Sequence, residues 1–443
     1  MTLPPLFLER MESLLGKKQF PLFLKTYQSL PQESIRIVED PQQVLKSLSI
    51  GNIPWVANGH WITNQSLHTS HPYHLAGAFS FQEASAMAVV PMMNIQPDDM
   101  VLDIAAAPGN KATQIASYLS KDGLLIANDV DAKRAQVLMF NVERMGLKQV
   151  VVTQHDPQHL KQLLPRAFDK ILIDAPCSGE GMFRKDEDAI QAWSVEHVST
   201  CAVRQEALLE SALPLLKDGG TITYSTSTFS PEENELRIET FLQKHPSFTL
   251  VNHPHFQYFD QTTTRGIGVK LFPHLIKGEG YYVAILQHNG STSKKQTYQH
   301  KMRNPMPISW IEFANQTLQP GSIQPNFILN DRMWMIPARY QFHPALHTLR
   351  AGVLMGEEIK KMFYPSHHLA RVLTPSMMKR SINLPLGDVR LSSYLRGEEF
   401  RFEIQDGWVL ITVDGLALGW GKASQGRIKN HYPKGLRLTQ SRI

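Results

Sequence analysis

Three aspartates in the first half of the chain follow short apolar runs that are typical of buried strands. They are Asp129, Asp156 and Asp174. Open α/β sheets bind their ligands beyond the carboxyl ends of the strands, so we expect the three carboxylates to face one crevice. An acid at the end of the second strand, where Asp129 stands, is suited to bonding the hydroxyls of a ribose. Capping of the following helix explains a single aspartate at such a position, but three in succession favour a nucleoside site.

A loop of small residues precedes these aspartates, between an apolar run that ends at Asp103 and a predicted helix. It consists of Ala105, Ala106, Ala107, Pro108, Gly109, Asn110 and Lys111. Small side chains let a backbone approach a ligand closely, and the first amides of the helix can donate to a carboxylate or phosphate. The loop is neither Gly-x-Gly-x-x-Gly nor a phosphate-binding loop. An adenosyl cofactor with an amino-acid tail, S-adenosylmethionine, therefore fits better than a dinucleotide.

Cysteine is scarce in this chain. Cys177 lies three residues after Asp174, on a loop beyond the fourth strand, whereas Cys201 falls within a long predicted helix and is expected to be a core residue. Two cysteines exclude a disulfide framework and a four-thiolate zinc site, and they fit a reducing, cytoplasmic location. The histidine cluster at residues 60–74 lacks a carboxylate or thiolate set, so no metal is expected.

Alternating strands and helices must position these residues. Strands are predicted over 101–104, 124–128, 150–153, 170–173 and 221–225, with helices over 111–118 and 132–145 among them. This alternation is the signature of a doubly wound parallel sheet, so the fold class is α/β. Segments 248–251 and 281–287 could close the sheet.

Two helix ends carry explicit sequence signals. A long helix over about 195–216 is predicted to end at residues 217–220 (Lys-Asp-Gly-Gly), because glycine suits a C-terminal cap. The next helix is predicted to start at Ser230, with Pro231 at its first position and Glu233 at its third.

The pattern divides the chain into regions, and its length suggests about three domains. Residues 1–94 begin with an amphipathic helix and are predicted to form an N-terminal α+β cap, and residues 95–290 form the α/β domain. A polar linker is predicted at 289–296. Residues 300–375 are assigned to an intermediate domain and residues 376–443 to a small strand-rich barrel.

The net charge of +5 is concentrated in a basic tail. The last 24 residues, from Trp420 onward, hold six Lys and Arg and no Asp or Glu, so the rest of the chain has 39 basic against 40 acidic residues. A basic patch beside a near-neutral body points to a polyanion such as nucleic acid. No apolar run reaches about 18 residues, so no membrane contact is expected.

Three stretches closely resemble motifs of the Fmu/Sun family of RNA cytosine-C5 methyltransferases. They are the Ala-Ala-Pro-Gly-Asn-Lys loop, the segment Asp-Ala-Pro-Cys-Ser-Gly-Glu-Gly from Asp174, and Tyr-Ser-Thr-Ser-Thr-Phe-Ser-Pro-Glu-Glu-Asn-Glu from Tyr224. Segments 394–398 and 419–437 resemble the C-terminal RNA-binding part of the bacterial branch that methylates small-subunit ribosomal RNA. The resemblance implies a Rossmann-like S-adenosylmethionine methyltransferase domain with an N-terminal cap and C-terminal small domains, the last of them a PUA-like β-barrel.

The resemblance also implies roles for particular residues. In the family, a cysteine thiolate adds to C6 of the target cytosine, C5 takes the methyl group, and loss of the C5 proton releases the enzyme. By this match, Asp174 would bond the base edge near the methyl group, and Cys177 would assist release of the adduct.

The cofactor contacts follow from the same match. Residues 105–111 would bind the methionine part of S-adenosylmethionine, Asp129 the ribose and Asp156 the adenine. Lys111 and Arg134 would give supporting contacts, and Asp174 would also lie against the cofactor.

The chain departs from the family pattern at the nucleophile. Where the family has Ser-Thr-Cys-Thr, this chain has Ser-Thr-Ser-Thr, so Ser227 stands in the nucleophile's place. A thiol with a pKa of about 8.5 supplies thiolate near neutral pH, whereas a serine hydroxyl needs an adjacent base. Three explanations stay open: Ser227 inactivates the chain, Cys177 acts as the nucleophile as in DNA cytosine-C5 methyltransferases, or a slow serine-based reaction survives.

Two further departures lie in the cofactor loop. Ala105 stands where the family often has cysteine, and Asn110 where glycine is usual. Asparagine tolerates a positive φ, so we expect the loop to keep its shape.

The expected function is methylation of cytosine C5 in 16S ribosomal RNA, on free RNA or on the small ribosomal subunit. The target cytosine must be flipped out or single-stranded, and the basic tail would hold the surrounding RNA. The alternative is a catalytically impaired RNA-binding or ribosome-assembly protein that retains the fold. A small-molecule methyltransferase is a third possibility.

Overall fold

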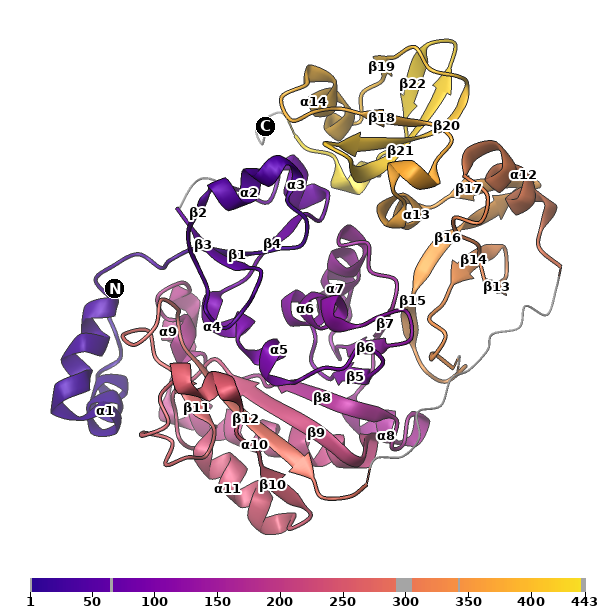
Figure 1. The fold of residues 1–443 in the computed structure, drawn as a ribbon. Coiled ribbons are helices and arrows are strands. Elements are labelled where there is room, and N and C mark those ends of the chain that lie inside the picture. Colours follow the sequence, from indigo (N-terminus) through magenta and orange to yellow (C-terminus); the bar gives the residue numbers. More distant parts are fainter. Residues whose placement is uncertain (1, 64–66, 292–304, 342, 440–443) are drawn as a thin grey trace.

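A computed structural model describes residues 2–63, 67–291, 305–341 and 343–439 (Figure 1). At its centre is a nine-stranded sheet in the order β10-β12-β9-β8-β5-β6-β7-β15, with β11 paired to β12. Its parallel strands are β5 (Met100–Asp103), β6 (Leu124–Asn128), β7 (Val150–Thr153), β8 (Phe168–Asp174) and β9 (Leu216–Thr226). The predicted doubly wound α/β fold is therefore confirmed.

Helices cover both faces of this sheet. Helices α6 (Asn110–Tyr118) and α7 (Ala132–Arg144) pack on one face, and α8 (Pro157–Leu163), α10 (Val195–Ala212) and α11 (Glu235–Lys244) on the other. Successive strand residues accordingly enter different cores: Val101 lies in the first and Leu102 in the second, and both are fully buried. Strands that are covered on both faces have continuous apolar sequences, which explains why these strands were predicted well from the sequence.

The sheet order reverses at β5, which lies between β8 and β6. A crevice opens at such a switch point, beyond the carboxyl ends of the strands, because the helices leave the two neighbouring strands on opposite faces. The loop after β5 and the loop after β8 both begin there. The fold thus brings the predicted cofactor loop and the segment from Asp174 together.

The sheet is closed by antiparallel strands. On one side β12 (Tyr281–His288) pairs with β9, followed by β10 (Phe248–Leu250) and β11 (Val269–Leu271). On the other side β15 (Thr348–Ala351), which comes from the C-terminal third of the chain, pairs with β7. The first pairing matches the expectation for 248–251 and 281–287, but the second was not foreseen.

The predicted C-terminal cap at residues 217–220 is wrong, because this segment belongs to β9. Helix α10 ends at Ala212, ahead of Pro214, and Leu216 already pairs with Phe168 of β8. Lys217 forms a buried ion pair with Asp169 (2.7 Å). The sheet therefore uses these residues although two of them are glycines.

The helix predicted to start at Ser230 begins at Glu235 instead. Ser230 does not cap it, because its hydroxyl donates to Glu180 (2.7 Å). The Glu233 carboxylate is likewise turned away and accepts from Ser178. Residues 231–234 form a turn because their side chains are engaged by another loop.

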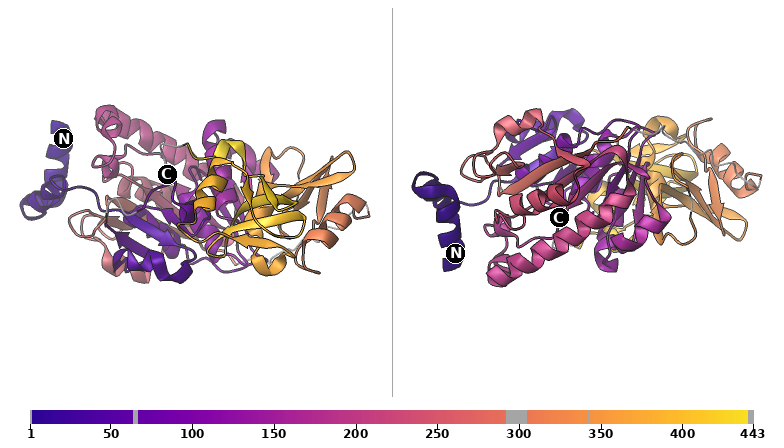
Figure 2. Two further views of the ribbon diagram at one scale, coloured as in Figure 1. Left: turned by 90° about the horizontal axis from the view of Figure 1, so that it is seen from above. Right: turned by 90° about the horizontal axis from the view of Figure 1, so that it is seen from below.

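The N-terminal region combines a long helix with a small sheet. Helix α1 (Pro5–Thr26) is kinked at Gly16 and packs through Phe7, Met11 and Phe23. The sheet has the order β2-β3-β1-β4, from Ser49–Asn52, Gly59–Ile62, Ser34–Ile37 and Phe79–Phe81. Short helices α2 (Val44–Ser47), α3 (Pro72–Leu75), α4 (Ala84–Met87) and α5 (Val89–Met92) complete it. The two views of Figure 2 place α1 at one end of the molecule and the C-terminal strands toward the other.

The C-terminal third contains two further sheets. The first joins β13 (Phe327–Leu329), β14 (Arg332–Met335), β16 (Val353–Ile359) and β17 (Met362–Pro365) beside α12 (Ile308–Thr317). The second joins β18 (Ser381–Asn383), β20 (Gly407–Val413), β21 (Leu416–Ser424), β22 (Arg427–Asn430) and β19 (Phe400–Arg401) in a curled half-barrel, with α13 (His367–Val372) and α14 (Val389–Arg396). Most of the predicted linker lies outside the described residues.

The two ends of the chain pack against one another. Apolar residues of the N-terminal sheet share one core with residues of the half-barrel, and the Tyr73 hydroxyl donates to Asp414 (2.8 Å). Trp420 is buried in the half-barrel, whereas Trp408 remains half-buried under the Lys422 ammonium. In the described part of the chain no helix has the length and apolar character to cross a membrane.

Candidate active site

The cofactor loop turns sharply at a glycine. Gly109 has a φ of +110° and precedes α6, which begins at Asn110. A Cβ at Gly109 would lie 3.0 Å from the Leu138 side chain, so glycine is required for both conformation and packing. Asn110 itself is helical, so its tolerance of a positive φ is not needed. The loop keeps its shape because the positive φ that its turn requires occurs at Gly109.

A cavity of about 260 Å³ lies between this loop and the strand ends. Its walls come from β5, the loop, β8, the N-terminal region and the start of β12, and include Asp103, Ala105, Ala106, Ala107, Pro108, Asn110, Lys111, Asp174, Gln82, Glu83, Met182 and Tyr281. The predicted loop residues other than Gly109 thus share one cavity with Asp174. Gln82, Glu83 and Tyr281 were not foreseen as lining residues.

Lys111 and Asp174 form an ion pair at the cavity wall. Lys111 Nζ lies 2.7 Å from Asp174 Oδ2 and donates to the Tyr281 hydroxyl (2.8 Å). Burial opposes the charge of Lys111, but the Asp174 carboxylate outweighs it and raises the lysine pKa. The Ser225 hydroxyl donates to the other Asp174 oxygen (2.8 Å). Both Asp174 oxygens are therefore held in position, and Lys111 orients a site carboxylate.

Asp103 is a site residue that the sequence reasoning missed. It is fully buried at the end of β5, and no side chain donates to either oxygen of its carboxylate. Burial, together with the nearby Asp174 carboxylate, raises the pKa of Asp103 to about 8. A signal was available, because Asp103 ends the strand that leads into the loop. A buried carboxylate of this kind calls for a cation.

Cys177 and Ser227 meet across two loops. Cys177 Sγ lies 3.3 Å from Ser227 Oγ, although the residues are 50 positions apart. Burial and the Glu233 carboxylate raise the pKa of Cys177 to about 12. Its thiol is therefore protonated at neutral pH. The other cysteine, Cys201, is buried in α10 as expected for a core residue.

Two buried glutamates lock these loops together reciprocally. Glu180, on the loop after β8, accepts from the Phe229 amide (2.8 Å) and the Ser230 hydroxyl (2.7 Å) on the loop after β9. In return Glu233, on the second loop, accepts from the Ser178 amide of the first loop (3.0 Å) and from Gln205 of α10 (2.7 Å). Each carboxylate satisfies donors of the opposite loop, so the separation of Cys177 and Ser227 is set by side chains that the sequence could not pair.

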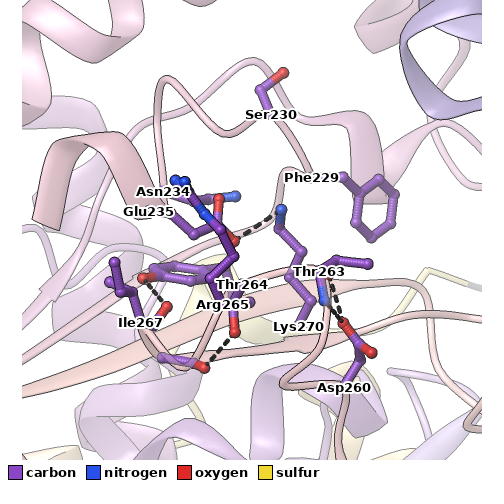
Figure 3. A network of polar contacts seen from close by, with 12 residues as sticks. Phe229, Ser230, Asn234, Glu235, Asp260, Thr263, Thr264, Arg265, Ile267 and Lys270 are labelled. Carbon is purple, nitrogen blue, oxygen red and sulfur yellow. Dashed lines mark hydrogen bonds and ion pairs between the residues drawn. The ribbon is translucent and has the colours of Figure 1, made fainter. Parts of the chain in front are cut away.

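Asn234 holds the backbone on both sides of Ser227. Its Oδ1 accepts from the Thr226 hydroxyl (2.6 Å), and its Nδ2 donates to the Thr228 carbonyl (3.0 Å). Figure 3 shows Asn234 beside Glu235, which is buried and paired with Lys270 of β11 (2.8 Å). The start of α11 is thereby anchored to the sheet edge, and Ser227 is presented on a fixed turn.

The remaining predicted cofactor residues lie around the loop. Asp129 is buried and accepts from the amides of Ala107 (3.2 Å) and Asp131 (3.0 Å). Arg134 donates to the Ala107 carbonyl (2.8 Å) and lies 3.4 Å from Asp129. Asp156 is exposed and caps α8 by accepting from Gln158. Asp129 and Arg134 therefore support the loop, whereas the structure gives Asp156 only a capping contact.

Groups of three or more metal-ligating side chains with suitable spacing are absent from the described residues. In the predicted histidine cluster, His71 instead caps α3.

The high pKa of Cys177 leads to a prediction for its reactivity. In a Cys201→Ser background, alkylation of Cys177 by iodoacetamide at pH 8 should be on the order of 10³-fold slower than that of an unperturbed cysteine, because the thiolate reacts. Glu233→Gln should speed the reaction by removing the neighbouring negative charge. Mass spectrometry of timed samples measures both rates. Alkylation as fast as that of free cysteine would instead favour Cys177 as the nucleophile.

Family models match four consecutive parts of the chain. Residues 3–84 match the N-terminal domain of 16S rRNA methyltransferase RsmF, and residues 90–287 match 16S rRNA methyltransferase RsmB/F. Residues 312–373 match the first C-terminal domain of RsmF rRNA methyltransferase, and residues 381–438 its PUA domain.

Curated relatives agree with these matches. The chain is 33% identical to ribosomal RNA small subunit methyltransferase F of Aeromonas salmonicida over 87% of its length and 84% of the relative's. It is 30% identical to the protein of that name from Erwinia tasmaniensis over 98% and 96%.

Two solved structures share the central fold. A methyltransferase homologue from Pyrococcus horikoshii is 27% identical, with a TM-score of 0.56 over 64% of this chain and 94% of its own. NSun6 from Pyrococcus horikoshii, solved with SFG, is 20% identical, with a TM-score of 0.58 over 65% and 99%. From the identity across nearly its whole length and the four matching domains, the chain belongs to the RsmF family of 16S ribosomal RNA methyltransferases.

Proposed function

We propose that this chain methylates C5 of a cytosine in 16S ribosomal RNA, with S-adenosylmethionine as the donor and Ser227 in the nucleophile's place. The contact of Cys177 and Ser227, 3.3 Å apart near the Asp174–Lys111 pair, carries the proposal. Addition to C6 and release of the adduct need two groups on the same side of a base, and these residues supply two adjacent positions. Methylation of a ring nitrogen needs no such pair.

The cavity beside the loop suits S-adenosylmethionine chemically. The buried Asp103 carboxylate lacks a side-chain donor, and the positive charges of this cofactor would compensate it. Three alanines keep the loop wall small, and α6 starts in that wall, where free amides favour a carboxylate. When bound, S-adenosylmethionine supplies an electrophilic methyl group. Asp129 and Arg134 would hold the loop in shape around it.

Asp174 would orient the base. One of its oxygens accepts from Ser225 and the other from Lys111. Each carboxylate oxygen has a second lone pair, so Asp174 can accept from the exocyclic amine of cytosine while it keeps these bonds. Lys111 acts as a positioning residue through this contact.

A second candidate function is RNA binding without efficient methylation, for example in ribosome assembly. Two observations favour it. The Ser227 hydroxyl lies within hydrogen-bond distance of Cys177, a weakly acidic thiol rather than a base. The pKa of Cys177, about 12, leaves almost no thiolate at neutral pH. Neither the Ser227 hydroxyl nor the Cys177 thiol is activated. Both candidate functions therefore predict slow methyl transfer by the unsubstituted chain.

The test is bisulfite mapping of 16S ribosomal RNA after incubation with the protein and S-adenosylmethionine. The experiment compares the unsubstituted chain with Ser227→Cys and Cys177→Ala, on free RNA and on small ribosomal subunits. Detection of 5-methylcytosine with any of these three proteins supports methylation of cytosine C5. If Cys177→Ala abolishes this methylation, the Cys177 thiol is identified as the nucleophile. If none of the forms methylates cytosine on either substrate, the proposal is wrong.

A further inference from the structure

A large cavity lies where the three parts of the molecule meet. It has a volume of about 810 Å³, within the usual range for ligand sites, and is lined by the N-terminal sheet region, α7 and the end of the half-barrel. In Figure 1, α3 and α7 lie on the side of the molecule that faces the half-barrel. Pro108 and Asn110 line both this cavity and the smaller one beside the cofactor loop. A ligand in the large cavity would therefore sit next to the proposed cofactor site.

Positive charge is buried in and behind one wall of this cavity without matching negative charge. Arg144 lines the cavity, and Arg371 and Arg36 lie near Arg144. Arg36, Arg144 and Arg371 are only 0%, 6% and 8% exposed, and within the described ranges none of them has an ion-pair partner. Their donors go to neutral groups: Arg144 bonds the His74 carbonyl (2.6 Å), and Arg371 bonds the Arg144 carbonyl (2.8 Å). Burial lowers the pKa of each guanidinium to about 10.

The other titratable groups of the wall do not cancel this charge. Glu143 lines the cavity, but its carboxylate is paired with Arg350 (2.8 Å). Burial lowers the pKa of His74 to about 3 and that of His367 to about 4, and the charges of nearby arginines act in the same direction. Both imidazoles are therefore neutral at neutral pH. Arg437 adds a further cation at the half-barrel side. A buried excess of positive charge favours an anionic ligand.

The same cavity exposes apolar and aromatic surface. Phe140 and Val137 project from α7 with 38% and 48% of their surface exposed, and Phe81 lies opposite on the N-terminal sheet. Aromatic faces next to cations are the combination that binds single-stranded nucleic acid, because bases stack on rings while phosphates meet the positive charge.

We propose that this cavity binds a nucleotide of the RNA substrate other than the target cytosine. Its base would lie against Phe140, and its phosphate would face Arg437 in the positive field of Arg144. The inference rests on the proposed function in that the ligand is the same RNA. It adds a site that holds a flanking nucleotide and so fixes which part of the RNA reaches Ser227.

The test compares binding of fluorescently labelled 16S ribosomal RNA by Arg437→Ala, Phe140→Ala and a matched control. Lys429→Ala is that control, because Lys429 is an exposed cation of the same basic tail but does not line the cavity. Arg437→Ala and Phe140→Ala should each weaken RNA binding about tenfold, and Lys429→Ala less than about twofold. S-adenosylmethionine binding, measured by calorimetry, should be unchanged in all three variants.

Equal weakening by Arg437→Ala and Lys429→Ala would overturn the inference, because only the charge of the tail would then matter. Ultraviolet crosslinking of the unmodified protein to the same RNA gives a second readout that does not depend on folding of a variant. Adducts in the α7 peptide that contains Phe140 support the site, and adducts confined to other surfaces contradict it. If the RNA is bound and crosslinked but never methylated, the proposed function fails while the nucleotide site stands.

Discussion

Ser227→Cys is expected to raise the rate of methyl transfer to 16S ribosomal RNA by about 10²- to 10⁴-fold, the usual contribution of an activated reacting group. Ser227 Oγ contacts the Cys177 thiol, which is itself protonated at neutral pH. A thiol at this position would retain the same backbone support from Asn234 and would supply some thiolate. Because the thiolate is the reacting form, the rate of the variant should increase with pH.

Single-turnover kinetics with radiolabelled S-adenosylmethionine measure this rate. Two further variants sharpen the experiment. Ser227→Ala should have the same rate of methyl transfer as the unsubstituted chain if the serine is inert. Ser227→Cys combined with Cys177→Ala should accumulate a covalent protein–RNA adduct that is visible on a denaturing gel. An unchanged rate for Ser227→Cys would show that position 227 does not supply the nucleophile.

Lys111→Met, made in the Ser227→Cys background, is expected to lower methyl transfer by about 10²- to 10³-fold, the usual effect of losing one preorganised electrostatic contact. The Lys111 ammonium holds Asp174 at 2.7 Å beside the cofactor cavity. Without it, Asp174 Oδ2 would lose the donor that fixes its position. Asp174 would then no longer be held in the orientation that accepts from the base.

Loss of stability must be separated from loss of chemistry, because breaking a buried ion pair costs about 3–5 kcal/mol. Lys217→Met provides the matched control: Lys217 pairs with Asp169 at the same distance, 2.7 Å, in the same sheet but away from the site. Both variants should unfold at lower denaturant concentration, whereas only Lys111→Met should lose methyl transfer per folded molecule. Equal activity of the two variants would remove Lys111 and Asp174 from the proposed mechanism.

Much of the α/β domain could be predicted from local patterns. The strands at 124–128 and 150–153 have the predicted bounds, because strands buried on both faces need continuous apolar runs. The errors lie where tertiary contacts overrule local signals. Residues 217–220 pair in β9 despite two glycines, and α11 starts at Glu235 because Ser230 and Glu233 bond the opposite loop.

The candidate site was predicted only in part. The loop residues other than Gly109 do share a cavity with Asp174, but Asp103 and Tyr281 were missed. No sequence spacing connects Tyr281 to Lys111, since the two residues are 170 positions apart and meet because β12 pairs with β9. The roles of Asp129, Asp156 and Arg134 toward the cofactor stay predictions.

The order of strands and helices in the α/β domain, the motifs of the family and the serine at position 227 follow from the sequence, because they depend on residue identity and on contacts between near neighbours. Three features required the folded chain: Cys177 and Ser227 lie 3.3 Å apart, Glu180 and Glu233 lock their loops, and positive charge is buried beside an 810 Å³ cavity. Distances between remote residues and the pKa values that follow from burial arise only when the chain has closed upon itself.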